Sequence, residues 1–342
     1  MNKDQTLKSK KTNLNSNLLG LFIFMVAVFI VMGLIKPQTY FSAANFQSMC
    51  FQFPEIGILA IGVMLPMITG GIDLSMVGIS NLSAIVAALF MIHVIPEGAS
   101  EGTQVVMVIT AFALAIVVGI ACGFFNGLIV TKFGTPPMIV TLGGQYLFMG
   151  IAIILTEGKP QLGFPEFFQE LGNGTIGGAI PIPLVFFIIV AVITYYILQK
   201  TPYGLKLYLI GANQKASRYS GLKVDSLLRK TYGAAGLMSA IAGFILIART
   251  NQANADYGTS YTLQSIMIAV LGGTNPNGGA GTVSGVVMAV LTMQFISTGI
   301  NTMGLSNVNF LRQLVWGVAL IAVMAINYFS AARKAKKALQ ST

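Results

Sequence analysis

Ten apolar runs constrain this chain more than any other feature of its sequence. A helix needs roughly 20 apolar residues to cross a hydrocarbon core of about 30 Å. Only 9% of the 342 residues are charged, against about 25% in soluble domains. We therefore predict an all-α polytopic membrane protein. The predicted spans are Leu18–Ile35, Cys50–Thr69, Leu74–Ile95, Val105–Val130, Pro137–Leu155, Ile180–Leu198, Tyr232–Ala248, Ser260–Leu271, Val283–Ile300 and Asn309–Phe329, the eighth being the shortest.

Basic residues orient these spans, because Lys and Arg concentrate in cytoplasmic loops. With the N-terminus inside, sixteen basic residues fall on the inner side and four, Lys36, Lys159, Arg249 and Arg312, fall outside. Seven acidic residues, Glu55 among them, are assigned to the outer side. This predicts cytoplasmic termini, with basic tails at 1–17 and 331–342 flanking a transmembrane domain over 18–330. The net charge of +10 then indicates anionic lipid headgroups, not nucleic acid, as the partner.

The sequence lacks the usual catalytic motifs. It contains no G-x-S-x-G, no H-E-x-x-H and no Gly-rich loop ending in Lys-Ser/Thr. Cys50 and Cys122 lack C-x-x-C spacing and His93 stands alone, so we expect neither a metal site nor a catalytic residue. Ion-coupled carriers usually hold ionisable groups near the bilayer centre, which disfavours that class. An ion-coupled carrier nevertheless stays an alternative, since unwound backbone carbonyls can bind Na⁺ without acidic side chains.

Neutral polar side chains remain inside the predicted spans. Hydrogen bonding between helices accounts for any one of them, but a path for an uncharged, hydroxyl-rich solute needs the same groups. Gln294, Ser297 and Asn301 share one helical face at i, i+3 and i+7. The candidate path-lining residues are Asn126, Gln145, Gln264, Gln294, Ser297 and Asn301.

Two Gly-Gly turns interrupt the apolar pattern at the predicted inner face. In TGGIDLSMVG (69–78), Gly70 and Gly71 can end one helix and Asp73 can cap the next. A similar turn, VLGGTNPNGG, occupies 270–279. Paired Gly-interrupted segments mark functional regions in transporters. We therefore expect an inner gate at the mouth of the path, formed by Gly70, Gly71, Asp73, Ser75, Gly272 and Gly273.

The longest cytoplasmic connection, 199–231, contains a predicted short helix over Asn213–Ser220. Asn213 is the expected N-cap and Gly221 the stop. Such a helix suits docking to a cytoplasmic partner, while an interfacial helix lying on lipid is the alternative.

Four stretches of the chain together resemble a known family. The first is the loop, which reads T-x-x-G and then G-x-N-x-x-A-S-x-x-S-G. The others are TGGIDLS (69–75), GTPPMIVTLGG (134–144) and AVLGGTNPNGGAGTVSG (269–285). Together they resemble, over essentially the whole chain, the permease subunits of bacterial ABC importers of the ribose/simple-sugar type, in the branched-chain amino acid/ribose permease superfamily. The matching loop positions are Thr201, Gly204, Gly211, Asn213, Ala216, Ser217, Ser220 and Gly221.

The resemblance implies a type II ABC importer-like permease in the bacterial inner membrane. Two permease subunits, identical or homologous, would enclose the path, and a periplasmic or lipid-anchored binding protein would deliver the solute. ATP and Mg would bind a separate ATPase subunit, with residues 213–221 in its cleft, so this chain would be no enzyme and hold no cofactor. A monosaccharide such as ribose is the expected cargo; autoinducer-2 or a nucleoside, a secondary carrier, and more distantly a membrane enzyme are the alternatives.

Two positions depart from the family pattern. The family usually has Asp-Leu-Ser-Val-Gly-Ser, whereas Met76 lengthens this stretch by one residue. An extra residue rotates a helix by about 100°, which predicts a bulge or register shift near Met76. Leu205 also replaces an arginine that commonly follows Gly204.

Overall fold

The computed structural model describes residues 3–96, 98–304, 308, 310–318 and 321, and most of them are helical. Residues 310–318 are helical as well. Before them come, in order, α1 (Lys3–Ile35), α2 (Pro37–Tyr40), α3 (Ala43–Ile68), α4 (Met76–Val94), α5 (Glu101–Phe133), α6 (Pro137–Thr156), α7 (Glu166–Asn173), β1 (Thr175–Ile176), β2 (Ile180–Pro181), α8 (Ile182–Lys200), α9 (Pro202–Ala212), α10 (Gln214–Tyr219), α11 (Val224–Thr250), α12 (Tyr261–Leu271) and α13 (Val283–Thr302).

The long helices confirm the all-α polytopic class. Within the described residues, eight helices are long and apolar enough to cross a membrane, and they match the first seven predicted spans and the ninth. The eighth predicted span is an 11-residue helix, α12, about 16 Å long. It therefore covers only half of a bilayer core. The tenth predicted span, 309–329, is described only at 310–318 and 321, which are helical; its other residues lie outside the described part.

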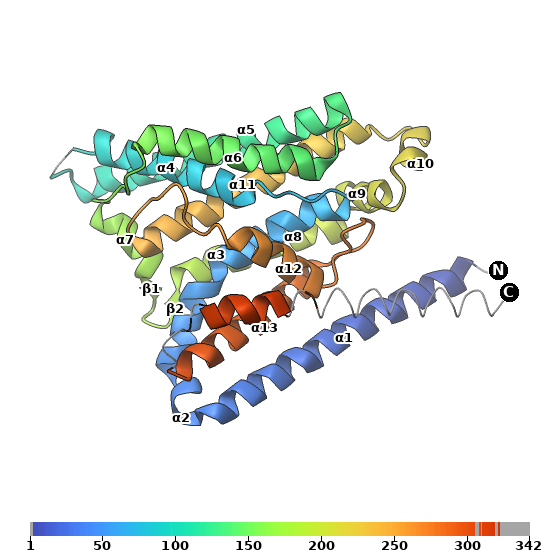
Figure 1. The fold of residues 1–342 in the computed structure, drawn as a ribbon, viewed down its shortest axis with the longest axis horizontal. Helices are drawn as coiled ribbons and strands as arrows, with labels where there is room; N and C mark the ends of the chain where they lie inside the picture. Colours follow the sequence, from blue (N-terminus) through green and yellow to red (C-terminus); the bar gives the residue numbers. More distant parts are fainter. Residues whose placement is uncertain (1–2, 97, 305–307, 309, 319–320, 322–342) are drawn as a thin grey trace.

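The helices run between two ends of the molecule. Figure 1 shows the start of α1 at the same end as α9 and α10, while α7, β1 and β2 lie at the opposite end. The β1–β2 hairpin and a bridge between Gln161 and Ala253 tie the loops together at that opposite end. The basic 199–231 loop thus shares an end with the N-terminal helix, as the charge distribution predicts for the cytoplasmic side.

Helices α3 and α11 form the centre of the bundle. Most of their side chains are buried, whereas α1, α5, α6 and α8 turn large apolar side chains outward, as helices facing lipid do. The small residues of 119–127 and 233–243 allow close approach, since a Cβ on Gly236 would overlap the carbonyl oxygen of Gly119. These stretches therefore serve helix packing.

The predicted bulge near Met76 is wrong. α4 is α-helical at every residue from Met76 to Val94, and the extra residue falls at its first helical position; a shift of register relative to the family stays a prediction. Met76 is fully buried. Its sulfur accepts a hydrogen bond of 3.2 Å from the hydroxyl of Ser239 on α11, and its methyl group lies against Gly62 of α3.

Candidate functional site

The inner corner between α3 and α4 is a tight turn. Gly70 lies in the left-handed region at φ +86, as a residue just beyond a helix end often does. Asp73 is fully buried and does not cap α4, so that prediction is wrong. Its Oδ1 instead accepts from the backbone N of Ser75 at 2.9 Å and from the Ser75 hydroxyl at 2.6 Å. Asp73 therefore stabilises an Asx turn that precedes the helix, and Ser75 occupies the N-cap position.

Side chains from α5 and α6 brace this corner. Asn126 donates from Nδ2 to the Ser75 hydroxyl at 2.8 Å. The Thr141 hydroxyl accepts from the Leu74 backbone N at 3.0 Å, and Oε1 of Gln145 accepts from the Gly78 backbone N at 2.7 Å. Two of the six candidate path-lining residues, Asn126 and Gln145, thus hold the corner in place.

The second Gly-Gly turn lies beside the first. Gly273 is also left-handed, at φ +85, and the loop beyond it folds back so that the Gly279 backbone N donates to the carbonyl of Ile68 at 2.9 Å. A Cβ on Gly278 would lie only 2.9 Å from the backbone N of Gly70. The two turns that the sequence paired therefore meet through their backbones.

The C-terminal end of α9 completes this contact. A Cβ on Gly211 would overlap the carbonyl oxygen of Ile68 and the backbone N of Gly279. The Tyr208 hydroxyl donates to the carbonyl of Gly281 at 2.8 Å, and burial raises the pKa of Tyr208, which keeps this donor protonated. We call the contact of residues 68–70, 211 and 278–279 the glycine junction.

Helix α10 projects from the glycine junction at the cytoplasmic end (Figure 1). The predicted short helix is confirmed: Oδ1 of Asn213 accepts from the Ala216 backbone N at 2.9 Å, and Gly221 stops the helix at φ +84. Ser217 is buried, and the Ser220 hydroxyl donates to its carbonyl at 2.9 Å. Tyr219, by contrast, is 92% exposed.

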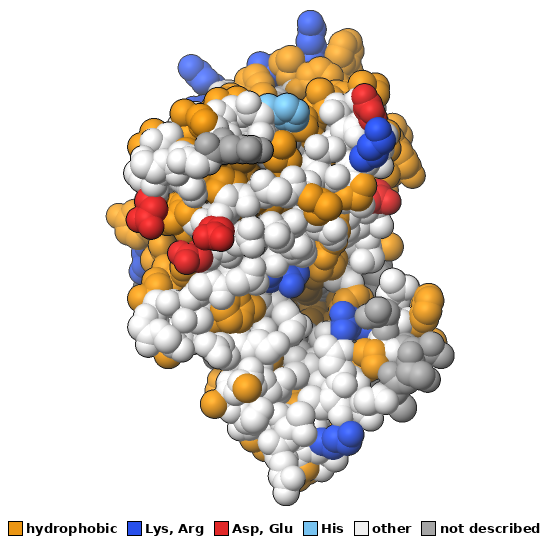
Figure 2. Space-filling view, turned by 90° about the vertical axis from the view of Figure 1, so that its left-hand side faces the viewer, with side chains coloured by type: hydrophobic (Ala, Val, Ile, Leu, Met, Phe, Trp, Pro, Cys, Tyr) orange, Lys and Arg blue, Asp and Glu red, His pale blue; other side chains and the backbone are white. Residues whose placement is uncertain are grey.

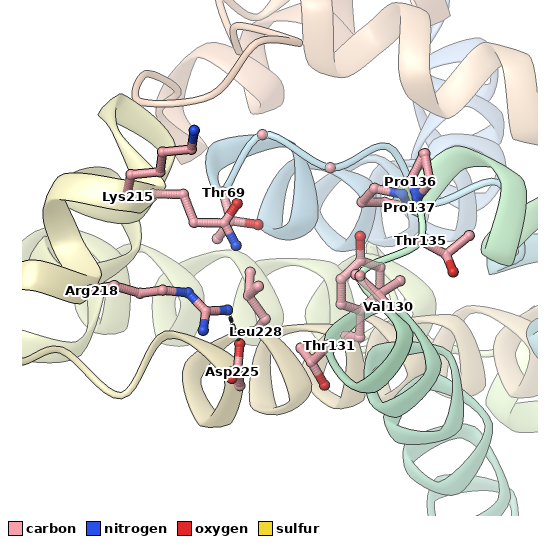
Figure 3. A pocket seen from close by; sticks show the side chains of 15 residues that line it. Thr69, Val130, Thr131, Thr135, Pro136, Pro137, Lys215, Arg218, Asp225 and Leu228 are labelled. Carbon is pink, nitrogen blue, oxygen red and sulfur yellow. Dashed lines mark hydrogen bonds and ion pairs between the residues drawn. The ribbon is translucent and has the colours of Figure 1, made fainter.

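A cytoplasmic cavity of about 390 Å³ separates α10 from the inner corner. Figure 3 shows Arg218 of α10 reaching to Asp225 at the start of α11, with which it forms an ion pair, while Lys215 points away from that pair. Pro136 and Pro137 lie on the opposite side of the cavity. The ion pair tethers α10 to α11, so α10 is joined to the bundle at both ends.

Glu55, which the charge count assigns to the outer side, is not in an outer loop. It lies within α3 and is 3% exposed. Its carboxylate accepts from Nη2 and Nε of Arg249 at 2.7 and 3.1 Å and from the Tyr261 hydroxyl at 3.2 Å. Partners of this kind are what a buried carboxylate requires to stay charged.

An outer cavity of about 320 Å³ surrounds this pair. Three candidate path-lining residues, Gln264, Gln294 and Ser297, line it together. Asn301 is exposed and instead accepts from Nη2 of Arg312 at 2.6 Å. Tyr257 also lines the cavity; burial and the Glu55 charge raise its pKa, against a lowering effect of Arg249.

Sequence reasoning missed Glu55, Arg249, Tyr257 and Tyr261. The sequence did contain one sign that Glu55 is buried, since it lies five residues inside the predicted span that begins at Cys50. In the part of the chain that the structure describes, no three His, Cys, Asp or Glu side chains gather as metal ligands would.

The arrangement of the helices is similar to that of a solved structure, a metal-chelate type ABC transporter in an inward-facing conformation. The TM-score is 0.52 at 14% identity, with 90% of this chain and 98% of that chain covered. Two curated proteins are more similar in sequence. The ribose import permease protein RbsC of Bacillus subtilis (strain 168) is 35% identical over 310 residues, 90% of this chain and 91% of that protein. The autoinducer 2 import system permease protein LsrD of Enterobacter sp. (strain 638) is 32% identical over 299 residues, 84% and 86%.

The membrane-spanning helices, the braced inner corner and the outer cavity together define a multi-pass membrane permease. Residues 45–324 match the family described as branched-chain amino acid transport system / permease component, and the chain belongs to that family. Its place is accordingly the bacterial inner membrane.

Proposed function

We propose that the chain is the membrane-spanning subunit of an ATP-binding-cassette importer and forms the path for a small neutral polar solute, a monosaccharide such as ribose. ATP and Mg bind a separate ATPase subunit, since this sequence has no Gly-rich loop ending in Lys-Ser/Thr. Two permease subunits enclose the path, and a periplasmic or lipid-anchored protein delivers the solute. The relatives that import ribose and autoinducer 2 support this proposal.

One observation carries the proposal: a capped cytoplasmic helix continues directly into the glycine junction. α10 begins three residues after Gly211, and Gly211 contacts both the end of α3 and the loop after α12. A displacement of α10 by a docked ATPase therefore reaches two elements of the bundle without an intervening flexible linker. The residues of 201–221 are in this proposal the ATPase-coupling segment.

Reconstitution tests this function. The chain is co-expressed with the ATPase subunit encoded beside it, and the complex is placed in proteoliposomes with the cognate binding protein. We expect uptake of radiolabelled D-ribose only with ATP and Mg²⁺, and none when the catalytic lysine of the ATPase is replaced. If the chain never associates with an ATPase, the proposal is wrong. Uptake by this chain alone, driven by a sodium or proton gradient, would show a secondary carrier instead.

The same preparation tests the inner gate. In a variant without Cys50 and Cys122, cysteines are placed at Ile72, which is partly exposed, and at Thr274, which is 2% exposed. We expect a membrane-impermeant thiol reagent to label the two positions differently with and without ATP. Identical labelling under both conditions contradicts a gating role for the two turns.

A further inference from the structure

The outer cavity contains a buried ion pair that still faces free space. The Glu55 carboxylate accepts three hydrogen bonds, two from Arg249 and one from Tyr261, while a carboxylate offers about four acceptor positions. The Arg249 side chain is 23% exposed and lines the cavity. Figure 2 views this end of the molecule and shows a hollow with basic side chains at it. Both charged groups therefore retain capacity for a polar ligand.

The same cavity is lined by polar atoms that lack partners. Gln264 is 4% exposed, yet neither its Oε1 nor its Nε2 has a hydrogen-bond partner, and the same is true of Nε of Arg312 and Nε1 of Trp316 among the described residues. Leaving a buried polar group unpaired destabilises the folded chain. Such groups in a cavity wall indicate that something else pairs with them.

The chemistry of these atoms selects a ligand class. Gln264 Nε2, Arg312 Nε and Trp316 Nε1 are donors, and Gln264 Oε1 is an acceptor. An anion would satisfy the donors and attract Arg312, but it would leave the acceptor Gln264 Oε1 unpaired and bring its charge close to Glu55. A hydroxyl group both donates and accepts, so several hydroxyl groups on one small molecule can satisfy the whole set.

Aromatic rings complete the lining. Tyr257, Tyr261 and Trp316 all contact the cavity, and the Arg312 guanidinium lies 5.9 Å from the centre of the Trp316 ring. An amphipathic ring offers an apolar face beside a polar edge. A sugar ring has the complementary character, with C–H bonds on its faces and hydroxyl groups around its rim. The cavity volume lies at the lower limit of small-molecule sites, about 300–1,000 Å³.

We propose that the outer cavity is a binding site for one neutral monosaccharide of about the size of ribose. This deepens the proposed function and rests on it. Glu55 and Arg249 hydrogen-bond neighbouring hydroxyl groups, Gln264 pairs with further hydroxyl groups through both amide atoms, and Trp316 and Tyr261 cover the ring. The solute stops here on its way inward.

The chain offers a direct probe, because Trp316 is its single tryptophan. The full-length chain in nanodiscs is titrated with D-ribose while tryptophan emission is recorded. Two matched probes accompany it: D-ribose 5-phosphate, which adds charge, and cyclopentanol, a five-membered ring with a single hydroxyl group. We expect a saturable change with ribose, and binding at least roughly tenfold weaker with either matched probe. Absence of a ribose response, or an equal response to a matched probe, overturns the proposal.

A substitution at Gln264 separates binding from folding. Q264M keeps the side-chain length and removes two unpaired buried polar atoms, so we expect no loss of thermal stability. The ribose affinity should fall by roughly tenfold or more. The matched control is Q104M on α5, whose Nε2 bonds only the Ala99 carbonyl, at 3.0 Å, outside the cavity. Equal ribose affinity in Q264M and wild type refutes the site, as does equal loss in both variants.

Transport by the complete complex distinguishes this inference from the proposed function. If ATP-driven ribose uptake by the Q264M complex keeps the wild-type KM, the cavity is no sugar site but the importer assignment stands. If no ATPase associates with the chain, the importer assignment fails whatever the tryptophan titration shows.

Discussion

Replacement of Gly211 by Ala tests the glycine junction directly. The new Cβ would overlap the carbonyl oxygen of Ile68 and the backbone N of Gly279, two atoms that form a hydrogen bond of 2.9 Å. Overpacking at such a contact costs about 1–3 kcal/mol. Alanine recovers about 0.5–1 kcal/mol within a helix. We therefore expect a net loss of up to about 2.5 kcal/mol, and separation of α9 from the two turns.

The assay measures both thermal stability and the coupling of ATP hydrolysis to sugar transport. G211A should lower the apparent melting temperature by a few degrees and reduce the number of sugars transported per ATP hydrolysed, while ATPase binding through α10 is kept. The matched control is Gly150→Ala in α6, where a Cβ would meet nothing within 4 Å; alanine there should be neutral or stabilising by about 0.5–1 kcal/mol. A G211A complex with wild-type stability and coupling would refute the role of the junction, and so would an equal loss in G150A.

Three further substitutions test other contacts. E55Q should destabilise the chain by less than the about 3–5 kcal/mol of a fully buried pair, because it leaves the partly buried Arg249 without a counter-charge, and the double variant E55Q/R249M should recover much of that loss in thermal unfolding. Y219A should leave stability unchanged, since the side chain is 92% exposed, but weaken ATPase association in co-purification by roughly tenfold or more, as loss of an aromatic interface anchor does. N213A removes the cap on Ala216 and should cost about 1 kcal/mol, visible as faster hydrogen exchange over 214–219.

The sequence predicts the features of this fold that depend on local interactions. Long apolar runs identify spans because a bilayer imposes the same length and composition on every crossing helix. The cap of α10 is equally local, since the bond from the Ala216 backbone N to Asn213 spans three residues. The Gly-Gly turns are recognisable because few residues other than glycine adopt φ near +86.

The long-range pairings could not be predicted in the same way. Glu55 and Arg249 are 194 residues apart, and only the packing of α3 against α11 brings them together. The same holds for Asn126 and Gln145, whose polarity suits either a path or a helix contact. Which of the two applies depends on the neighbour that each side chain meets after folding. The shortness of α12 had a partial signal in its closing Gly272-Gly273.

Helix α3 connects the outer cavity to the glycine junction. Glu55 in the outer cavity and Ile68 at the glycine junction lie on the same continuous helix, and the 13 residues from 55 to 68 correspond to about 20 Å along its axis. α12 makes a less direct connection: Gln264 lines the cavity, and the loop that follows Leu271 leads to Gly278 and Gly279 of the junction. Pro66 interrupts the hydrogen bonding of α3 between these two residues, so a shift imposed at the junction can reach the cavity wall through α3 with a bend at that point, and through α12. If the outer cavity binds sugar and α10 transmits a displacement, as proposed above, we expect both to be coupled through these two helices.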